Sequence, residues 1–218
     1  MVDSNSTTDG GLPILEMPDF AMEDPQDGSS PSWLPHLQEH GVVVVKNVMD
    51  SEQVQRAVDL YWEFLDKNFQ FMKRRNPKMW SEDGKQDLVV KDASTLQNKN
   101  WPVTIHGFSA QNYCNHSEAA WYMRTLPNVK KCFAQIYETD DLITSFDTII
   151  CWRQWWLGPE DDYTGTAKWL PRTEGLHVDQ NPISKKGFHC IQGMLLLQDI
   201  DERIGGFEVI QDTANDAA

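Results

Sequence analysis

The sequence is short of basic residues and of paired cysteines, and each shortage excludes a class of protein. Its 218 residues contain 19 Lys and Arg against 33 Asp and Glu, a formal net charge of −14. A nucleic-acid groove needs clustered Lys and Arg to displace counterions, so we expect no nucleic-acid partner. The four cysteines lie far apart and form no CxxC pair. Neither a zinc knuckle nor a redox motif is therefore predicted, and we expect reduced, mostly buried thiols.

No apolar run is long enough to cross a bilayer, and the first residues lack the basic and apolar blocks of a signal peptide. We therefore expect no membrane partner and a cytoplasmic location, with an organelle left open. Residues 1–31 are rich in Ser, Asp, Gly and Pro and are predicted to form a disordered leader. With 40% hydrophobic residues, nine Trp and nine Phe, the chain can bury a single core within residues 32–218.

Periodicity and capping residues predict a mixture of helices and strands. Residues 41–45 are predicted to form a buried strand, and residues 142–156 one or two more. Asp50 is predicted to cap a helix whose apolar stripe packs in the core. Ser117 is predicted to cap a second helix, which ends near residue 125 before Pro127. Residues 76–115 show no periodicity and could form a lid over a pocket.

The most informative segment is Gly-Leu-His-Val-Asp-Gln-Asn-Pro at residues 175–182, which places an imidazole and a carboxylate two residues apart. In a strand, residues i and i+2 share a face, so His177 and Asp179 can converge on one point. Together they supply two thirds of the 2-His-1-carboxylate triad, which holds Fe(II) and leaves positions open for substrate and dioxygen. An HxD pair alone is more often a surface ion pair or a hydrogen-bonded histidine, so the context decides.

The context of this pair is a series of turns and strands. A turn segment at 181–187 is followed by an apolar run at 191–197, an acidic turn that ends in two glycines, and a short strand at 207–210. This order is typical of a jelly-roll or cupin-type double sheet. The fold class is therefore predicted as α+β, mostly β with flanking helices, around a jelly-roll or cupin-type core.

In this context the sequence resembles the phytanoyl-CoA dioxygenase-like family of Fe(II)/2-oxoglutarate-dependent oxygenases. The resemblance rests on His-Val-Asp-Gln-Asn-Pro at 177–182, Gln-Gly-Met-Leu-Leu-Leu-Gln-Asp at 192–199 and Gly-Gly-Phe-Glu-Val-Ile at 205–210, and upstream on residues 120–127, 145–147 and 152–155. It implies a double-stranded β-helix with iron at His177 and Asp179 and 2-oxoglutarate as cosubstrate. It also implies hydroxylation of a small organic or acyl substrate.

The sequence departs from the family pattern after residue 210. In the family, the strand after the double glycine leads to a turn whose histidine is the third metal ligand, and an arginine beyond it pairs with 2-oxoglutarate. Here Asp212, Thr213 and Ala214 stand in that register, and the sequence ends at Ala218. The resemblance therefore predicts a C-terminally truncated domain that turns over 2-oxoglutarate far more slowly than a complete family member, or not at all. It also predicts exposed sheet edges through which the chain could self-associate.

Two further side chains are candidates for cosubstrate binding. Arg153 stands in an otherwise apolar stretch and needs an anionic partner, which a cosubstrate carboxylate or an acyl-CoA phosphate would supply. An internal ion pair or a snorkelling side chain accounts for Arg153 at least as well. Gln192 could hydrogen-bond a carboxylate in the same pocket, or it could face solvent. His189 is the nearest spare imidazole, although a structural or exposed role fits it better than metal ligation.

Two other classes of protein stay open. The first is a non-catalytic interaction module that keeps the scaffold without its metal chemistry. The second is a metal enzyme of another cupin type, in which His189 or a histidine of a second subunit completes the site. Fe(II)-dependent consumption of 2-oxoglutarate would separate the family interpretation from both.

Overall fold

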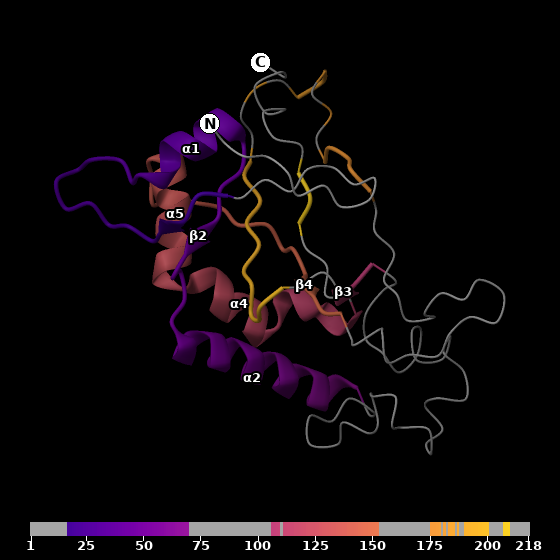
Figure 1. Cartoon of the computed structure of the whole chain (residues 1–218). Coiled ribbons are helices and arrows are strands. Elements are labelled where there is room, and N and C mark those ends of the chain that lie inside the picture. Colours follow the sequence, from indigo (N-terminus) through magenta and orange to yellow (C-terminus); the bar gives the residue numbers. More distant parts are fainter. Residues whose placement is uncertain are drawn as a thin grey trace, which may run out of the picture. The chain divides into compact units, whose positions relative to one another are not determined.

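The chain divides into two compact units, residues 1–48 with 211–218, and residues 49–210. The computed structural model describes residues 17–69, 106–109, 111–152, 175–179, 181, 183–185, 187, 190–200 and 207–209. Figure 1 shows the helices and strands in these residues. None of the helices in this described part combines the length and the apolar character needed to cross a bilayer.

The first unit contains one helix and a pair of short strands among its described residues. Helix α1 (Trp33–His40) ends at Gly41, which has a φ of 75° and donates its N–H to the carbonyl of Leu37 (2.8 Å). Glycine suits this left-handed position because it has no Cβ to clash with the backbone. Strand β1 (Phe20–Ala21) pairs in parallel with β2 (Val45–Lys46).

This unit differs from one sequence-based expectation, and it contains part of the segment named in a second. The strand expected at 41–45 is limited to Val45–Lys46, and Val44 is 46% exposed, because only two residues pair with β1. Within the segment expected to be a disordered leader, residues 20–21 form β1, and Glu23 accepts a hydrogen bond from the N–H of Ser32 (2.8 Å). Residues 1–16 of that segment lie outside the described residues.

In the second unit, helix α2 (Ser51–Asn68) begins at the predicted cap. The Asp50 carboxylate accepts from the N–H of Gln53 (2.8 Å), and the Gln53 side chain accepts from the N–H of Asp50 (3.1 Å). This capping box satisfies two N–H groups that have no intrahelical acceptor. The helix buries one stripe of its surface, formed by Ala57, Leu60, Tyr61 and Leu65.

The remaining elements of this unit are short. They are β3 (Phe108–Ser109), the 3-10 helix η4 (Gln111–His116), α4 (Glu118–Thr125), α5 (Pro127–Tyr137) and β4 (Ile149–Ile150). Ser117 caps α4, as predicted, by accepting from the N–H of Ala120 (3.2 Å). Pro127 is the first residue of α5, where its missing N–H costs no hydrogen bond. Strands β3 and β4 pair antiparallel, and the double-stranded β-helix stays a prediction.

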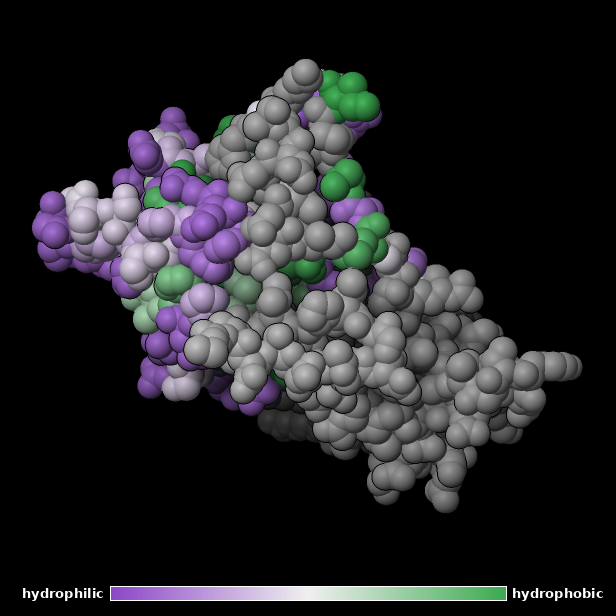
Figure 2. Space-filling view, turned by 45° about the horizontal axis from the view of Figure 1, so that its top comes forward, coloured by the Kyte–Doolittle hydropathy of each residue, from purple (hydrophilic) through white to green (hydrophobic). Residues whose placement is uncertain are grey.

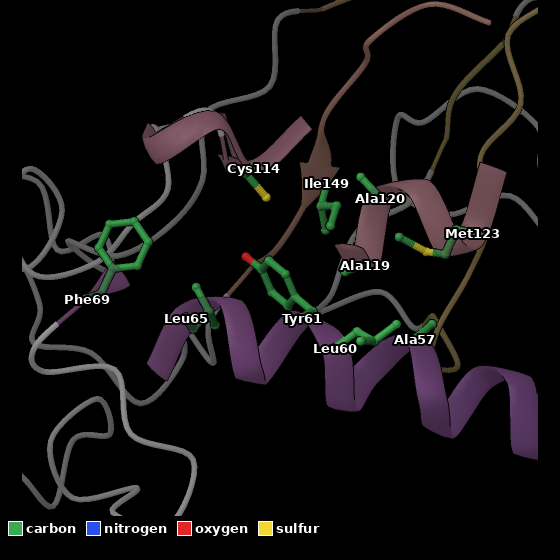
Figure 3. Packing of buried hydrophobic residues seen from close by; sticks show 10 residues of the cluster. All are labelled: Ala57, Leu60, Tyr61, Leu65, Phe69, Cys114, Ala119, Ala120, Met123 and Ile149. Atoms are coloured by element: carbon green, nitrogen blue, oxygen red, sulfur yellow. The ribbon is translucent and has the colours of Figure 1, made fainter. Parts of the chain in front are cut away.

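The core of the second unit forms where α2 packs against α4. Figure 3 shows its buried side chains, which are Ala57, Leu60, Tyr61, Leu65, Phe69, Cys114, Ala119, Ala120, Met123 and Ile149. Alanines stand on both facing surfaces, with Ala57 and Ala119 each 0% exposed. Because alanine side chains are small, the two helices approach closely, and the larger Leu65 and Tyr61 fill the space beside them.

A Leu65→Ala substitution should destabilise the chain by about 2–5 kcal/mol, because it removes a fully buried side chain and leaves a cavity. Urea unfolding followed by circular dichroism would measure the loss. The matched control is Lys67→Ala on the exposed side of α2, which we expect to change the free energy of unfolding by less than about 0.5 kcal/mol. Equal effects of the two substitutions would contradict the packing described here.

Arg124 on α4 joins two neighbouring segments to that helix. Its Nη1 donates to the carbonyl of Asn115 (2.6 Å), its Nη2 donates to the carbonyl of Asp147, and its guanidinium lies over the Trp121 ring, 5.4 Å from the centroid. The Asn115 amide in turn donates to the carbonyl of Phe146 (3.1 Å). Two of the upstream motif segments, 120–127 and 145–147, are thereby held together.

An Arg124→Met substitution should cost about 1–2 kcal/mol of unfolding free energy, because two carbonyl acceptors lose a charged donor. The matched control is Arg56→Met on α2. Arg56 pairs with Glu63 (3.2 Å) and with Glu118 of α4 (3.6 Å) at exposed positions, and we expect a loss of less than about 1 kcal/mol. Thermal or urea unfolding of both variants would show which loses more unfolding free energy. A larger loss for Arg56→Met than for Arg124→Met would contradict the role of Arg124.

The second unit also exposes large apolar side chains in its C-terminal part. These are Leu176, Val178, Ile183, Met194, Leu196, Ile200, Phe207 and Val209. Apolar groups at the surface are visible in green on the face drawn in Figure 2. Exposed apolar surface is typical of contact surfaces between molecules, and self-association of this chain stays a prediction.

Candidate metal site at His177 and Asp179

His177 and Asp179 contact each other, although residues 175–179 form no strand in the structure as described. The Nε2 atom of His177 lies 3.1 Å from Oδ1 of Asp179. Both side chains are about half exposed, at 52% and 53%. The two functional groups expected to converge on one point therefore meet directly.

The second ring nitrogen of His177 also faces an acceptor. Its Nδ1 lies 2.9 Å from the carbonyl oxygen of Gly175. A neutral imidazole has only one N–H. If Nδ1 donates that proton to Gly175, Nε2 presents a lone pair to the Asp179 carboxylate, and the two repel. The contact is attractive when Nε2 also carries a proton, which makes it a hydrogen-bonded ion pair, or when a cation beside the pair binds both Nε2 and Oδ1.

The distance between the two atoms suits a shared metal ion. Two ligands on adjacent positions of an octahedral ion, each roughly 2.1 Å from the metal, lie about 3 Å apart. The observed separation of 3.1 Å agrees with this value. A metal-bound histidine usually donates its other N–H to a carbonyl or a carboxylate, which is the role that the Gly175 carbonyl takes here. The same separation is that of a direct hydrogen bond between an imidazole and a carboxylate. The two donors are therefore of the right type and spacing for a divalent cation, but the distance alone does not distinguish a metal site from an ion pair.

The second oxygen of the Asp179 carboxylate has a different partner. The Nε2 amide of Gln192 donates to Oδ2 of Asp179, while Oδ1 faces His177. Gln192 is thus bonded to a carboxylate, but this carboxylate belongs to the chain itself. The binding of Gln192 to the carboxylate of a cosubstrate stays a prediction.

The structure does not describe the positions of two other candidates that the sequence offered. Arg153 and His189 lie outside the described residues. Within the described part of the chain, no group of three His, Cys, Asp or Glu side chains is arranged to hold a metal ion. Sequence reasoning also missed Tyr137, whose hydroxyl accepts from the N–H of Ile191 (2.9 Å), next to Gln192. Nothing in the residues around position 137 signals a contact 54 positions away.

A separate polar group lies in the core of the second unit. The Tyr61 hydroxyl donates to Oγ of Ser109 (3.0 Å), and both side chains are buried. Burial raises the pKa of Tyr61 well above its usual value and raises the pKa of the Cys151 thiol to about 11. It also raises the pKa of Cys114. These groups therefore stay protonated at neutral pH and act as uncharged hydrogen-bonding groups.

The four cysteines should differ sharply in reactivity toward a thiol reagent such as DTNB. None of them forms a disulfide; Cys190 is exposed and Cys114 is buried. With a pKa of about 11, only on the order of one Cys151 thiol in a thousand is ionised at pH 8. We expect one fast phase, which disappears in Cys190→Ser, and slow phases that accelerate as the pH rises toward 11. A fast phase that survives in Cys190→Ser would contradict the lower exposure of the other three thiols.

Comparison with known proteins adds sequence similarity to this geometry. The chain is 31% identical over 163 residues to "Ava biosynthesis cluster protein O" of Aspergillus versicolor, a match that covers 75% of this chain and 44% of the relative. It is 24% identical over 182 residues to "Putative phytanoyl-CoA dioxygenase" of Dictyostelium discoideum, which covers 83% of this chain and 46% of the relative. The chain thus spans less than half the length of these curated relatives.

No protein-family model and no solved structure matches the chain. The paired imidazole and carboxylate define a candidate mononuclear metal site, and the Dictyostelium protein bears the family name that the motifs indicated. The resemblance of the chain to phytanoyl-CoA dioxygenase-like proteins is therefore confirmed.

Proposed function

We propose that this chain carries part of the active site of an Fe(II)/2-oxoglutarate-dependent oxygenase of the phytanoyl-CoA dioxygenase type. The domain would be a double-stranded β-helix, and the substrate a small organic or acyl molecule. One observation carries the proposal. Nε2 of His177 and Oδ1 of Asp179 lie 3.1 Å apart, while Nδ1 of His177 faces the Gly175 carbonyl. The similarity to a protein named as a dioxygenase supports the same assignment.

The chain's own residues would prepare the site for the metal. The carbonyl of Gly175 would hold the imidazole proton on Nδ1 and leave the lone pair of Nε2 for the cation. The carboxylate of Asp179 supplies an anionic oxygen beside it. Bound Fe(II) with 2-oxoglutarate would supply the dioxygen chemistry that no side chain can provide. A third protein ligand and the groups that bind 2-oxoglutarate would come from outside the described residues.

The proposal predicts that metal affinity depends on both side chains of the pair. Co(II) can replace Fe(II) as a spectroscopic probe, with binding followed by its visible absorption or by calorimetry. We expect His177→Ala and Asp179→Ala to weaken Co(II) binding by more than about 100-fold, since loss of an outer hydrogen-bond partner alone costs 10–100-fold. The control is His40→Ala in the first unit, which should leave the affinity unchanged. Equal binding by all four proteins would contradict the site.

The same variants test the reaction. With Fe(II), ascorbate and 2-oxoglutarate, the unaltered chain should form succinate in an Fe(II)-dependent manner but far more slowly than a complete family member, and His177→Ala should form none above the blank. Metal binding without any succinate would instead fit a non-catalytic module on the same scaffold. Succinate formation that persists in His177→Ala would overturn the assignment of this residue.

A further inference from the structure

We propose that Gln192 is a positioning residue that holds the Asp179 carboxylate in place for the metal. This inference rests on the proposed function only in calling Asp179 a ligand. The contact itself is the hydrogen bond from the Gln192 amide to Oδ2 of Asp179. Two features of the surrounding chain explain why Gln192, 13 residues further along the chain than Asp179, reaches this point and stays there.

The segment that carries Gln192 is extended, and its side chains alternate between two faces. Ile191, Leu195 and Leu197 are partly buried, and the two leucines pack against the core of the second unit. The residues between them, Met194 and Leu196, are each 47% exposed. Because residues i and i+2 of an extended chain share a face, Gln192 belongs to the outer face. Figure 1 draws this segment as an extended gold trace.

Both neighbours of Gln192 are in contact with helix α5. The N–H of Ile191 donates to the Tyr137 hydroxyl (2.9 Å). At Gly193 the backbone approaches the Phe133 ring so closely that an added Cβ would lie 2.9 Å from its Cζ. Phe133 and Tyr137 stand four residues apart on α5 and therefore share one face of the helix. The backbone on either side of Gln192 is thus fixed against that face.

Because of this hydrogen bond, the two oxygens of the Asp179 carboxylate have different partners. Oδ2 accepts from Gln192, which orients the carboxylate so that Oδ1 faces Nε2 of His177. An amide is suited to this role because it donates a hydrogen bond without bringing a second charge to the site. Carboxylates that bind metals are commonly held by such outer hydrogen bonds. Asn at position 192 would be one methylene shorter and would fall short of Oδ2.

The chain offers a matched pair of variants to test this role. Gln192→Met keeps the size of the side chain and removes its donor. Gln198→Met makes the same change in an exposed glutamine of the same segment. We expect Gln192→Met to weaken Co(II) binding by about 10–100-fold, the range found for outer-shell partners, and Gln198→Met to leave it unchanged.

A conservative variant supplies a readout that a purely structural role would not move. In Gln192→Glu the new carboxylate repels Asp179 when ionised, but when protonated it can donate an O–H to Oδ2. Because the ionised and protonated forms of the new side chain differ both in their effect on Asp179 and in their attraction for the cation, the ratio of the variant's Co(II) affinity to that of the unaltered chain, measured at the same pH, should change as the pH falls toward 5. A ratio that stays constant with pH would contradict the hydrogen-bonding role.

A metal-free measurement separates this inference from the proposed function. In NMR spectra of the chain without metal, the side-chain amide of Gln192 should be shifted from that of Gln198 and should exchange more slowly with water. Asp179→Ala should abolish both differences. Matching Gln192 and Gln198 amides in the unaltered chain would overturn the inference.

The NMR measurement and the Co(II) affinity of Gln192→Met together distinguish failure of this inference from failure of the proposed function. A shifted amide together with weaker Co(II) binding in Gln192→Met supports the positioning role. A shifted amide with unchanged Co(II) binding in that variant overturns it, although the metal site remains. If the unaltered chain binds no Co(II), the proposed function fails, and the amide measurement alone decides whether Gln192 holds Asp179.

Discussion

The packing of α2 against α4 is the contact on which the described part of the second unit depends. Alanines on the facing surfaces bring the two helices close together, and Leu65 and Tyr61 fill the space that remains. The extended segment at 191–197 lies against this same core through Leu195 and Leu197. The segment that contains Gln192 therefore packs against the helical core.

The candidate site itself contains little buried surface, and its geometry comes from hydrogen bonds. His177 and Asp179 are half exposed, and each is oriented by a partner, the Gly175 carbonyl for the imidazole and the Gln192 amide for the carboxylate. The Gln192 segment is fixed to α5 through Tyr137. Among the described residues, contacts with α5 thus fix the extended segment at 191–197, and Gln192 of that segment holds Asp179.

Features of local origin could be predicted from the sequence, whereas features that depend on distant contacts could not. The caps at Asp50 and Ser117 were predictable because a capping side chain bonds to a backbone N–H within its own first turn. The length of β2 depends on pairing with residues 20–21, and the bond between Tyr137 and Ile191 spans 54 positions. His177 and Asp179 could be recognised in the sequence as a pair because they stand only two positions apart.

The hydrogen bond from Gln192 has a consequence for how many coordination positions Asp179 can occupy. With Oδ2 accepting from the amide, the carboxylate turns a single oxygen, Oδ1, toward His177. A carboxylate that binds through one oxygen takes up one position on a metal ion, whereas a bidentate carboxylate takes up two. An octahedral ion at this pair would then keep four positions for other ligands. Gln192 would thereby favour binding of Asp179 through Oδ1 alone, and a third protein ligand and incoming molecules would share the positions left open.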